Sequence, residues 1–326
     1  MSTTSSEIPT KLEVIIVGAG IGGLVLGQLL EQIDVPYHIF ERATTIKPLG
    51  AAMSLGASVL PIFEQLGLLE EFKKICLPCY NADMCNDKTE KLGCLDMKGL
   101  DKLLGSQNLI FARPQLFDLL LSRIPTHKIS LGKKVLRTVE KEGRVRVHFS
   151  DNTTHEADIL VGADGVYSSV RQSLFKHLDR QGVLPKSDME TFAVASINMV
   201  GVTIPEDPSK YPQLKDNFSH FSVVIGGSGG RSWGVTNAPG NQICWSLITQ
   251  LSESDARSMQ FRNSEWGPES LESMYKEYEN TLCPWGGTMG EVMKGTPKDR
   301  ISKVFIEEKL FKTWYGGRTM LLGAGL

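Results

Sequence analysis

The sequence carries little net charge and contains no block of Lys or Arg residues. Its 326 residues include 35 Lys and Arg against 37 Asp and Glu, which gives a formal charge of -2 at pH 7. A surface that binds nucleic acid usually shows a basic excess or a basic stripe. We therefore expect no DNA or RNA partner.

A secretory or membrane-spanning segment is also lacking. Residues 14–30 are almost free of charge. However, Glu7 and Glu13 do not fit the positively charged start of a signal peptide, and several glycines interrupt the apolar run. The apolar stretch is also short for a membrane span. We expect a cytoplasmic protein with no membrane segment in this chain, while a membrane anchor in a longer form stays open.

Cysteine is scarce, with six residues in the chain. Without a signal peptide, these cysteines indicate a reducing compartment. Cys76-Leu77-Pro78-Cys79 has the spacing of half a zinc knuckle, but Cys85 and Cys94 lack the paired spacing of the second half. We predict no metal site, and interpret residues 76–105 as a loop-rich insert with buried or half-buried thiols.

Residues 14–24 predict a buried strand that runs through a glycine turn into a helix. Four apolar residues, Val14 to Val17, suit a parallel strand that is covered on both faces. Gly18, Gly20 and Gly23 follow with the G-x-G-x-x-G spacing. The first glycine permits the tight turn, the second lets the backbone approach a pyrophosphate, and the third lets the helix pack closely. The phosphates would bind at the helix N-terminus.

A carboxylate follows the next strand. Glu41 ends the run Tyr37-His38-Ile39-Phe40, eighteen residues after Gly23, where it can accept a hydrogen bond from a ribose hydroxyl. The alternative is a glycine-rich turn that binds nothing. Because strand, turn, helix and acid occur together, we interpret the segment as a dinucleotide-binding β-α-β unit.

The rest of the chain alternates between strand-like and helix-like segments. A helix is predicted from Pro114 to Arg123, with Arg113 at its start, because proline suits the first helical position. Alternating apolar and polar residues over 144–149 predict a small antiparallel meander. Further expected helices span 58–66 and 68–75, and expected strands span 108–112, 159–162, 218–225, 232–237, 243–249 and 319–323.

Taken together, separated motifs resemble those of the single-component FAD-dependent aromatic monooxygenases, the group that includes p-hydroxybenzoate and salicylate hydroxylases, and most of all its fungal members. One is the glycine turn with Glu41-Arg42, which the resemblance assigns to the ADP half of FAD. Another is Asp164-Gly165-x-x-Ser168-x-x-Arg171, similar to a motif implicated in binding both FAD and NAD(P)H. Arg113 is similar to the family arginine beside the flavin phosphate and ribitol, where a guanidinium matches phosphate. The predicted cofactor-binding residues are Gly18, Gly20, Gly22, Gly23, Glu41, Arg42, Arg113, Asp164, Gly165 and Arg171.

A third family motif departs from the pattern. After the last strand the family has Gly-Asp, whose aspartate binds FAD ribitol, whereas this chain has Gly323-Ala324-Gly325-Leu326. We therefore expect a C-terminally truncated member that binds FAD weakly. Whether this form is active stays open.

The resemblance implies an α/β fold of two interleaved domains. One is a Rossmann-like FAD-binding domain of the p-hydroxybenzoate hydroxylase type, and the other is a mostly antiparallel α+β substrate domain. We assign residues 11–75, 106–180 and 297–326 to the first domain, 76–105 and 181–296 to the second, and 1–10 to a flexible tail.

The implied activity is that of an FAD-dependent monooxygenase, which uses NAD(P)H and O2 to hydroxylate or epoxidise an aromatic or isoprenoid-like, electron-rich small molecule. We expect Phe218, Phe221, Trp233 and Trp245 to supply apolar walls for it. No histidine lies in a recognisable motif, so the catalytic residues are unknown. The alternatives are an FAD-linked reductase of the same fold and a truncated, non-catalytic nucleotide-binding fragment. The substrate, the choice of NADH or NADPH and the oligomeric state stay open.

Overall fold

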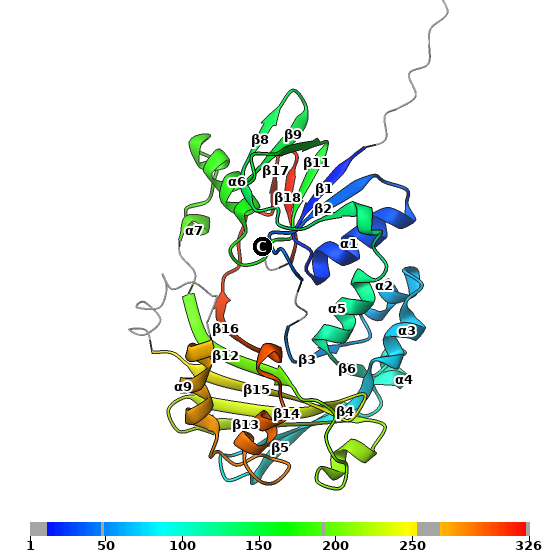
Figure 1. Cartoon of the computed structure of the whole chain (residues 1–326), viewed down its shortest axis with the longest axis vertical. Helices are drawn as coiled ribbons and strands as arrows, with labels where there is room; N and C mark the ends of the chain where they lie inside the picture. The colour runs from blue at the N-terminus through cyan, green and yellow to red at the C-terminus, as the bar shows by residue number, and fades with distance from the viewer. Residues whose placement is uncertain (1–11, 47–48, 191–192, 253–267, 324–326) are drawn as a thin grey trace, which may run out of the picture. The chain divides into compact units, whose positions relative to one another are not determined.

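The computed structural model describes residues 12–46, 49–190, 193–252 and 268–323 (Figure 1). The expected flexible tail, residues 1–10, lies outside the described residues. Contacts within the chain separate it into two units. The first consists of Met1–Ile46, Leu120–Thr191 and Leu310–Leu326, and the second of Lys47–Leu119 and Phe192–Lys309.

The first unit is built on a six-stranded sheet in the order β17-β18-β11-β1-β2-β7. The central strand β1 pairs in parallel with β11 and β2, and β18 continues the parallel arrangement beyond β11. This confirms the predicted Rossmann-like α/β sheet. The strands are β1 Val14–Val17, β2 Tyr37–Phe40, β7 Ile129–Ser130, β11 Ile159–Gly162, β17 Tyr315–Gly316 and β18 Thr319–Leu321.

Each face of this sheet is covered by a different layer. Helix α1 (Ile21–Gln32) packs closely on one face, where Gly27 leaves room for Ile39. On the other face lie α6 (Ser169–Arg180) and the antiparallel strands β8 (Val135–Lys141), β9 (Arg144–Phe149) and β10 (Thr154–Ala157). As predicted, alternate β9 residues are buried, and they share a core with β1 and β11.

The second unit contains a nine-stranded, mostly antiparallel sheet. Its main path runs β16-β12-β15-β14-β13-β4-β6-β3, and β5 pairs with β4 beside that path. The pairing of β13 with β4 is parallel. The strands are β3 Ala52–Leu55, β4 Leu77–Cys85, β5 Lys91–Asp96, β6 Asn108–Ala112, β12 Ala193–Val202, β13 Ser219–Gly227, β14 Arg231–Ala238, β15 Gln242–Gln250 and β16 Ile301–Glu308.

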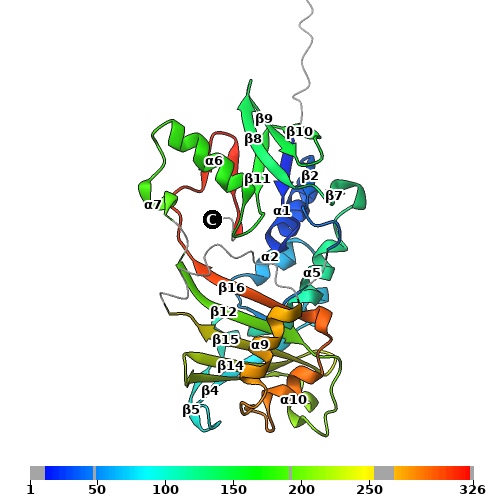
Figure 2. The ribbon, with the colours of Figure 1, turned by 60° about the vertical axis from the view of Figure 1, so that its left-hand side comes forward.

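Helices α9 (Pro268–Tyr278) and α10 (Met289–Lys294) cover one face of this sheet, as Figure 2 shows. Trp233 and Trp245 are almost fully buried in the core beneath them. The indole of Trp233 donates to the Leu282 carbonyl at 2.8 Å, and that of Trp245 donates to Thr296 Oγ1 at 2.8 Å. The prediction that these tryptophans line a substrate pocket is therefore wrong, because they pack against helices instead.

The expectation of a loop-rich insert at residues 76–105 is also wrong. It contains β4, β5 and the short helix α4 (Leu100–Leu104). The signal for β4 was hidden because every third residue is buried, namely Cys79, Ala82 and Cys85, rather than every second one.

The boundary between the two units differs from our domain assignment at 47–75, 106–119 and 297–309, which belong to the second unit, and at 181–191, which belongs to the first. Strands β3 and β6 pair with each other, and β6 also pairs with β4, so this part belongs to the larger sheet. The predicted helices are present nearby. They are α2 Leu60–Gln65, α3 Leu69–Lys74 and α5 Arg113–Leu121, and a further helix in the first unit is α7 Lys186–Met189.

Candidate functional site

The turn between β1 and α1 is held together by two glycines that the fold itself requires. Gly18 has φ +106°, and a Cβ there would lie 2.3 Å from the Ala163 carbonyl oxygen. A Cβ on Gly23 would lie 2.1 Å from the Gly18 carbonyl oxygen. Any side chain at either position would collide with backbone, so both glycines set the close packing of turn, strand and helix.

Gly20 differs from these two because a Cβ there would meet no atom within 4 Å. It is the N-cap residue, directly before Ile21 at the start of α1, and the first turn of α1 contains no acidic side chain. The first amides of a helix have no intrahelical acceptor and favour an anion. The space beside Gly20 is therefore a cradle suited to a phosphate or pyrophosphate, which a side chain would fill. Gly22 lies next to it, where a Cβ would be 3.6 Å from the Leu322 side chain.

Glu41 is fixed beside this turn. Its carboxylate accepts hydrogen bonds from the Ala19 amide at 2.9 Å and from the Ala43 amide at 2.8 Å. An ionised carboxylate has about four acceptor positions, so two remain for a ligand hydroxyl. Arg42 follows and is exposed. The geometry thus agrees with an acid that bridges the glycine turn and a ribose.

A second turn follows β11 and adjoins the first one. The Ala163 amide donates to the Val17 carbonyl at 2.7 Å, which ties the two turns together. Asp164 then accepts from the Ser168 hydroxyl and from the amides of Ser169 (2.7 Å) and Val170 (3.3 Å). This carboxylate therefore caps α6, and the φ of +77° at Gly165 lets the loop turn back.

Arg171 holds the same loop from inside the protein. It is 4% exposed, its guanidinium donates to the Val166 carbonyl, and it lies 4.6 Å above the Phe311 ring. These contacts make Arg171 a positioning residue for the loop after Asp164. Its direct contact with a cofactor stays a prediction.

The end of β18 completes this edge of the sheet. The Leu322 amide donates to the Gly162 carbonyl at 2.9 Å, and Gly323 has φ +68°. The turns after β1, β11 and β18 therefore meet at the carboxyl edge of one sheet, where open α/β sheets bind ligands. Ala324, the position of the missing aspartate, lies outside the described residues.

Arg113 belongs to the second unit, where it begins α5. Its guanidinium donates to the Leu49 carbonyl, and burial lowers its pKa. Gly50 lies against it with φ +132°, and a Cβ there would be 2.8 Å from Arg113 Cδ. Sequence reasoning missed Gly50, although the Pro48-Leu49-Gly50 run signals a turn. Contact between Arg113 and a cofactor stays a prediction.

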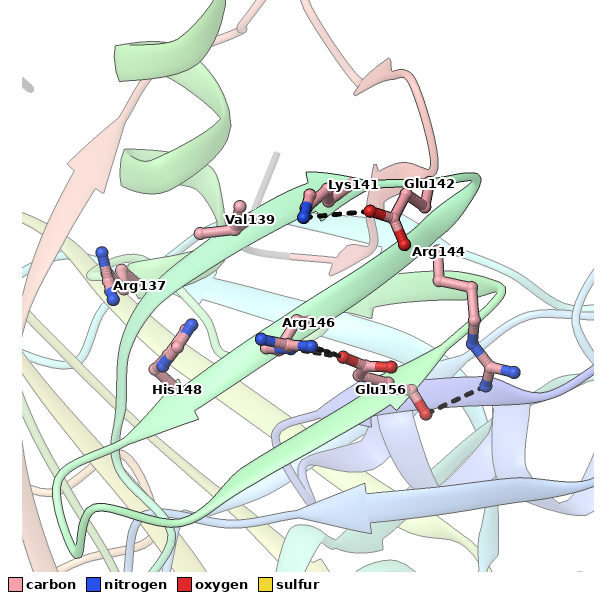
Figure 3. Close-up of a pocket in the computed structure, with 8 residues that line it drawn as sticks. All are labelled: Arg137, Val139, Lys141, Glu142, Arg144, Arg146, His148 and Glu156. Atoms are coloured by element: carbon pink, nitrogen blue, oxygen red, sulfur yellow. Dashed lines mark hydrogen bonds and ion pairs between the residues drawn. The ribbon is translucent and has the colours of Figure 1, made fainter.

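A hollow of about 380 Å³ on the small sheet of the first unit is a different feature (Figure 3). Most of its cations already have carboxylate partners, since Arg146 pairs with Glu156 and Lys141 with Glu142. Its side chains point away from the buried face of β9. None of the candidate cofactor-binding residues lines this hollow. Its lining residues are Arg137, Val139, Lys141, Glu142, Arg144, Arg146, His148 and Glu156.

The cysteines in β4 and directly before it are placed for packing. Cys76, Cys79 and Cys85 are buried, and burial raises the pKa of Cys76 to about 12. Cys94 is exposed on β5. Within the part of the chain that the structure describes, no cluster of three or more His, Cys, Asp or Glu side chains is arranged to hold a metal ion.

Among the described residues, no helix has both the length and the apolar character that crossing a membrane requires.

A protein-family model described as the FAD binding domain matches residues 11–231. The curated FAD-dependent monooxygenase ctvC of Aspergillus terreus is 24% identical over 322 residues, which cover 96% of this chain and 64% of the relative. The chain thus spans just under two thirds of that relative's length. The 3-amino-4-hydroxybenzoate 2-monooxygenase of Streptomyces cremeus is 28% identical over 230 residues, covering 67% of this chain and 57% of the relative.

Solved structures share the fold. Klebsiella pneumoniae HpxO, solved in complex with FAD and uric acid, has a TM-score of 0.75 at 19% identity, covering 96% of this chain and 73% of its own. The 2,6-dihydroxypyridine-3-hydroxylase of Arthrobacter nicotinovorans has a TM-score of 0.72 at 16% identity, covering 97% and 78%. With the family match over residues 11–231, the chain belongs to the FAD-binding domain family, and the curated relatives that it resembles are FAD-dependent monooxygenases.

Proposed function

We propose that this protein is an FAD-dependent monooxygenase, which uses NADH or NADPH and O2 to insert one oxygen atom into an aromatic or other electron-rich small molecule. The observation that carries the proposal is the open space at Gly20, in a turn that packs through Gly18 against the turn at Ala163 and Asp164 and that Glu41 holds through the Ala19 amide. The family match supports FAD as the dinucleotide.

Different residues of the first unit would contribute to FAD binding in different ways. The amides that follow Gly20 would hold the pyrophosphate, and Glu41 would accept a ribose hydroxyl. Gly165 would let the loop backbone approach the cofactor, while Arg171 keeps that loop in place. Bound FAD supplies the chemistry, accepting hydride from NAD(P)H and activating O2. The chain supplies position, electrostatics and exclusion of water.

An aromatic substrate is supported by the relatives rather than by a defined pocket. One curated relative is named for an aminohydroxybenzoate, and one solved relative was crystallised with uric acid. In the second unit, Phe218 lies edge-on to Tyr80 at 5.8 Å and beside His220 at 4.6 Å. These rings are candidates for an aromatic wall, and Phe221 stays a predicted one. An isoprenoid-like substrate remains the second class to test.

We also propose that the protein works in the cytoplasm without a nucleic-acid partner. All six cysteines are unpaired, which suits a reducing compartment. The formal charge of -2 supports the second statement, since it offers no basic excess.

Activity of the purified chain tests the proposal. The chain is mixed with FAD, NADH or NADPH, and a panel of hydroxybenzoates, aminohydroxybenzoates, purines and prenylated phenols, and oxygen uptake is recorded. We expect substrate-stimulated oxygen uptake and a product heavier by one oxygen atom. Reduction of a substrate without oxygen uptake would identify a reductase, and failure to bind flavin would identify a non-catalytic nucleotide-binding protein.

A further inference from the structure

A short segment of the second unit exposes four leucines that a folded domain ordinarily covers. In residues 91–105, which we call the leucine segment, Leu92 is 59% exposed, Leu95 58%, Leu103 81% and Leu104 62%. Single exposed leucines are common on protein surfaces, but Leu103 and Leu104 are neighbours on one helical turn, and adjacent exposed apolar side chains mark a contact surface.

Helix α4 lies in this segment and gives it an apolar stripe. Leu100, Leu103 and Leu104 follow the i, i+3, i+4 spacing of one helix face. All five residues of α4 are at least partly exposed. Gly99 and Gly105 bound the helix with φ +82° and +79°, so the chain turns sharply at both ends. The helix therefore projects its leucines from the surface as a compact turn.

The charges around the leucine segment balance one another. Two of the acids are bound locally, since Asp96 accepts from the Lys98 amide and Asp101 accepts from Gln107 Nε2, both at 2.9 Å. The segment therefore does not favour a partner that is strongly positive or strongly negative, and its contact surface is mainly apolar. The charged residues are Asp87, Lys88, Glu90, Lys91, Asp96, Lys98, Asp101 and Lys102.

The size and composition of the segment favour a lipid surface over a second protein. A stable protein interface buries about 800 Å² on each partner, formed by about 20 to 30 residues, whereas α4 is a single short turn. A helix that lies in a membrane interface inserts its apolar face between the lipid headgroups and the acyl chains. Long cationic side chains beside that face keep their charged ends at the headgroups. Leu103 and Leu104 with Lys98 and Lys102 provide both.

We infer that the leucine segment binds to the surface of a phospholipid membrane, into which Leu103 and Leu104 insert. This inference goes beyond the proposed function and does not depend on flavin chemistry. Because the contact is apolar and small, binding is reversible and depends little on salt. A substrate dissolved in the membrane would then be close to the protein.

Sedimentation with phosphatidylcholine vesicles tests the inference. We expect the wild-type chain to sediment with vesicles at millimolar lipid and to do so equally at about 0.1 and about 0.5 M NaCl. The double variant Leu103→Glu/Leu104→Glu should bind at least about tenfold more weakly. Leu310→Glu is the matched control, since Leu310 is 82% exposed in the first unit, and it should bind like wild type.

Three outcomes would overturn the inference. They are absence of wild-type binding, equal binding by the double variant, and a wild-type dimer in light scattering that the double variant abolishes. Circular dichroism checks that the double variant is folded. Its FAD affinity should equal that of wild type, so failure of vesicle binding leaves the proposed function untouched.

Discussion

The glycines of the β1–α1 turn differ in what makes each of them necessary. Gly18 and Gly23 are enclosed by backbone, whereas Gly20 faces open space. The first two are thus requirements of folding, and we propose that the third is a requirement of the ligand. The sequence spacing is the same in either case, so only the surroundings separate these roles.

Gly18→Ala should destabilise the fold. Its φ of +106° and the 2.3 Å approach to Ala163 make a Cβ strained and obstructed, so we expect a loss of at least about 2 kcal/mol in the free energy of unfolding. Urea denaturation measures it. Gly20→Ala is the control and should change stability by less than about 1 kcal/mol. Equal stability of the two variants would contradict the description of the turn.

Glu41→Ala should weaken FAD binding by about 1 to 3 kcal/mol, because a hydrogen bond to a charged acceptor is lost. A titration followed by flavin fluorescence gives the affinity. Glu142→Ala, at an exposed hairpin, serves as the control. If Glu41→Ala binds FAD as tightly as wild type, the ribose lies elsewhere.

At the scale of secondary-structure elements, continuous apolar runs and alternating runs were predictable. Residues 14–17, 37–40 and 159–162 became the parallel strands β1, β2 and β11, and residues 144–149 became β9. The errors arose where the deciding contact lies far along the chain. The sequence shows that Trp233 and Trp245 are apolar, but it does not show which face of the sheet they lie on. That face is covered by α9 and α10, which come later in the chain.

The placement of the candidate site residues was predictable to the same extent. The turn glycines, Glu41 and Asp164 lie at strand ends, as expected, because their spacing from a strand end is local. The role of Arg171 in holding the loop was not predictable, since its partner Phe311 is distant in the sequence. Gly50 was missed because its tight contact is with Arg113, on a different element.

Asp164→Ala should loosen the start of α6. The variant removes an acceptor for the Ser168 hydroxyl and for the amides of Ser169 and Val170. We expect a loss of about 1 to 2 kcal/mol in stability and faster hydrogen exchange over residues 165–171. Asp164→Asn retains one oxygen and should lose less. Unchanged exchange in the alanine variant would show that the loop is held by other contacts.

At the scale of the whole molecule, stability should depend on pH through His38. Burial lowers its pKa, the neighbouring His155 and His127 lower it further, and Glu13 opposes them. Its Nε2 lies 2.8 Å from Ser130 Oγ. Below about pH 6.5 the unfolded chain takes up a proton that the folded chain resists, so stability falls as the pH decreases.

His38→Gln should reduce this loss. We expect the drop in melting temperature between about pH 7.5 and about pH 5.5 to be smaller than in wild type. His177→Gln, at an exposed position on α6, is the control and should keep the wild-type drop. An equal drop in all three proteins would assign the acid sensitivity to other groups.

The central claim also belongs to the whole molecule, because the cradle forms only when the ends of β1, β11 and β18 come together. The most direct test is an FAD titration of wild type and Gly20→Val, with urea denaturation of both proteins. The account predicts that wild type binds one FAD per chain, and that the valine fills the cradle and abolishes FAD retention while the fold stays intact. Equal FAD affinity in a folded Gly20→Val variant would contradict it.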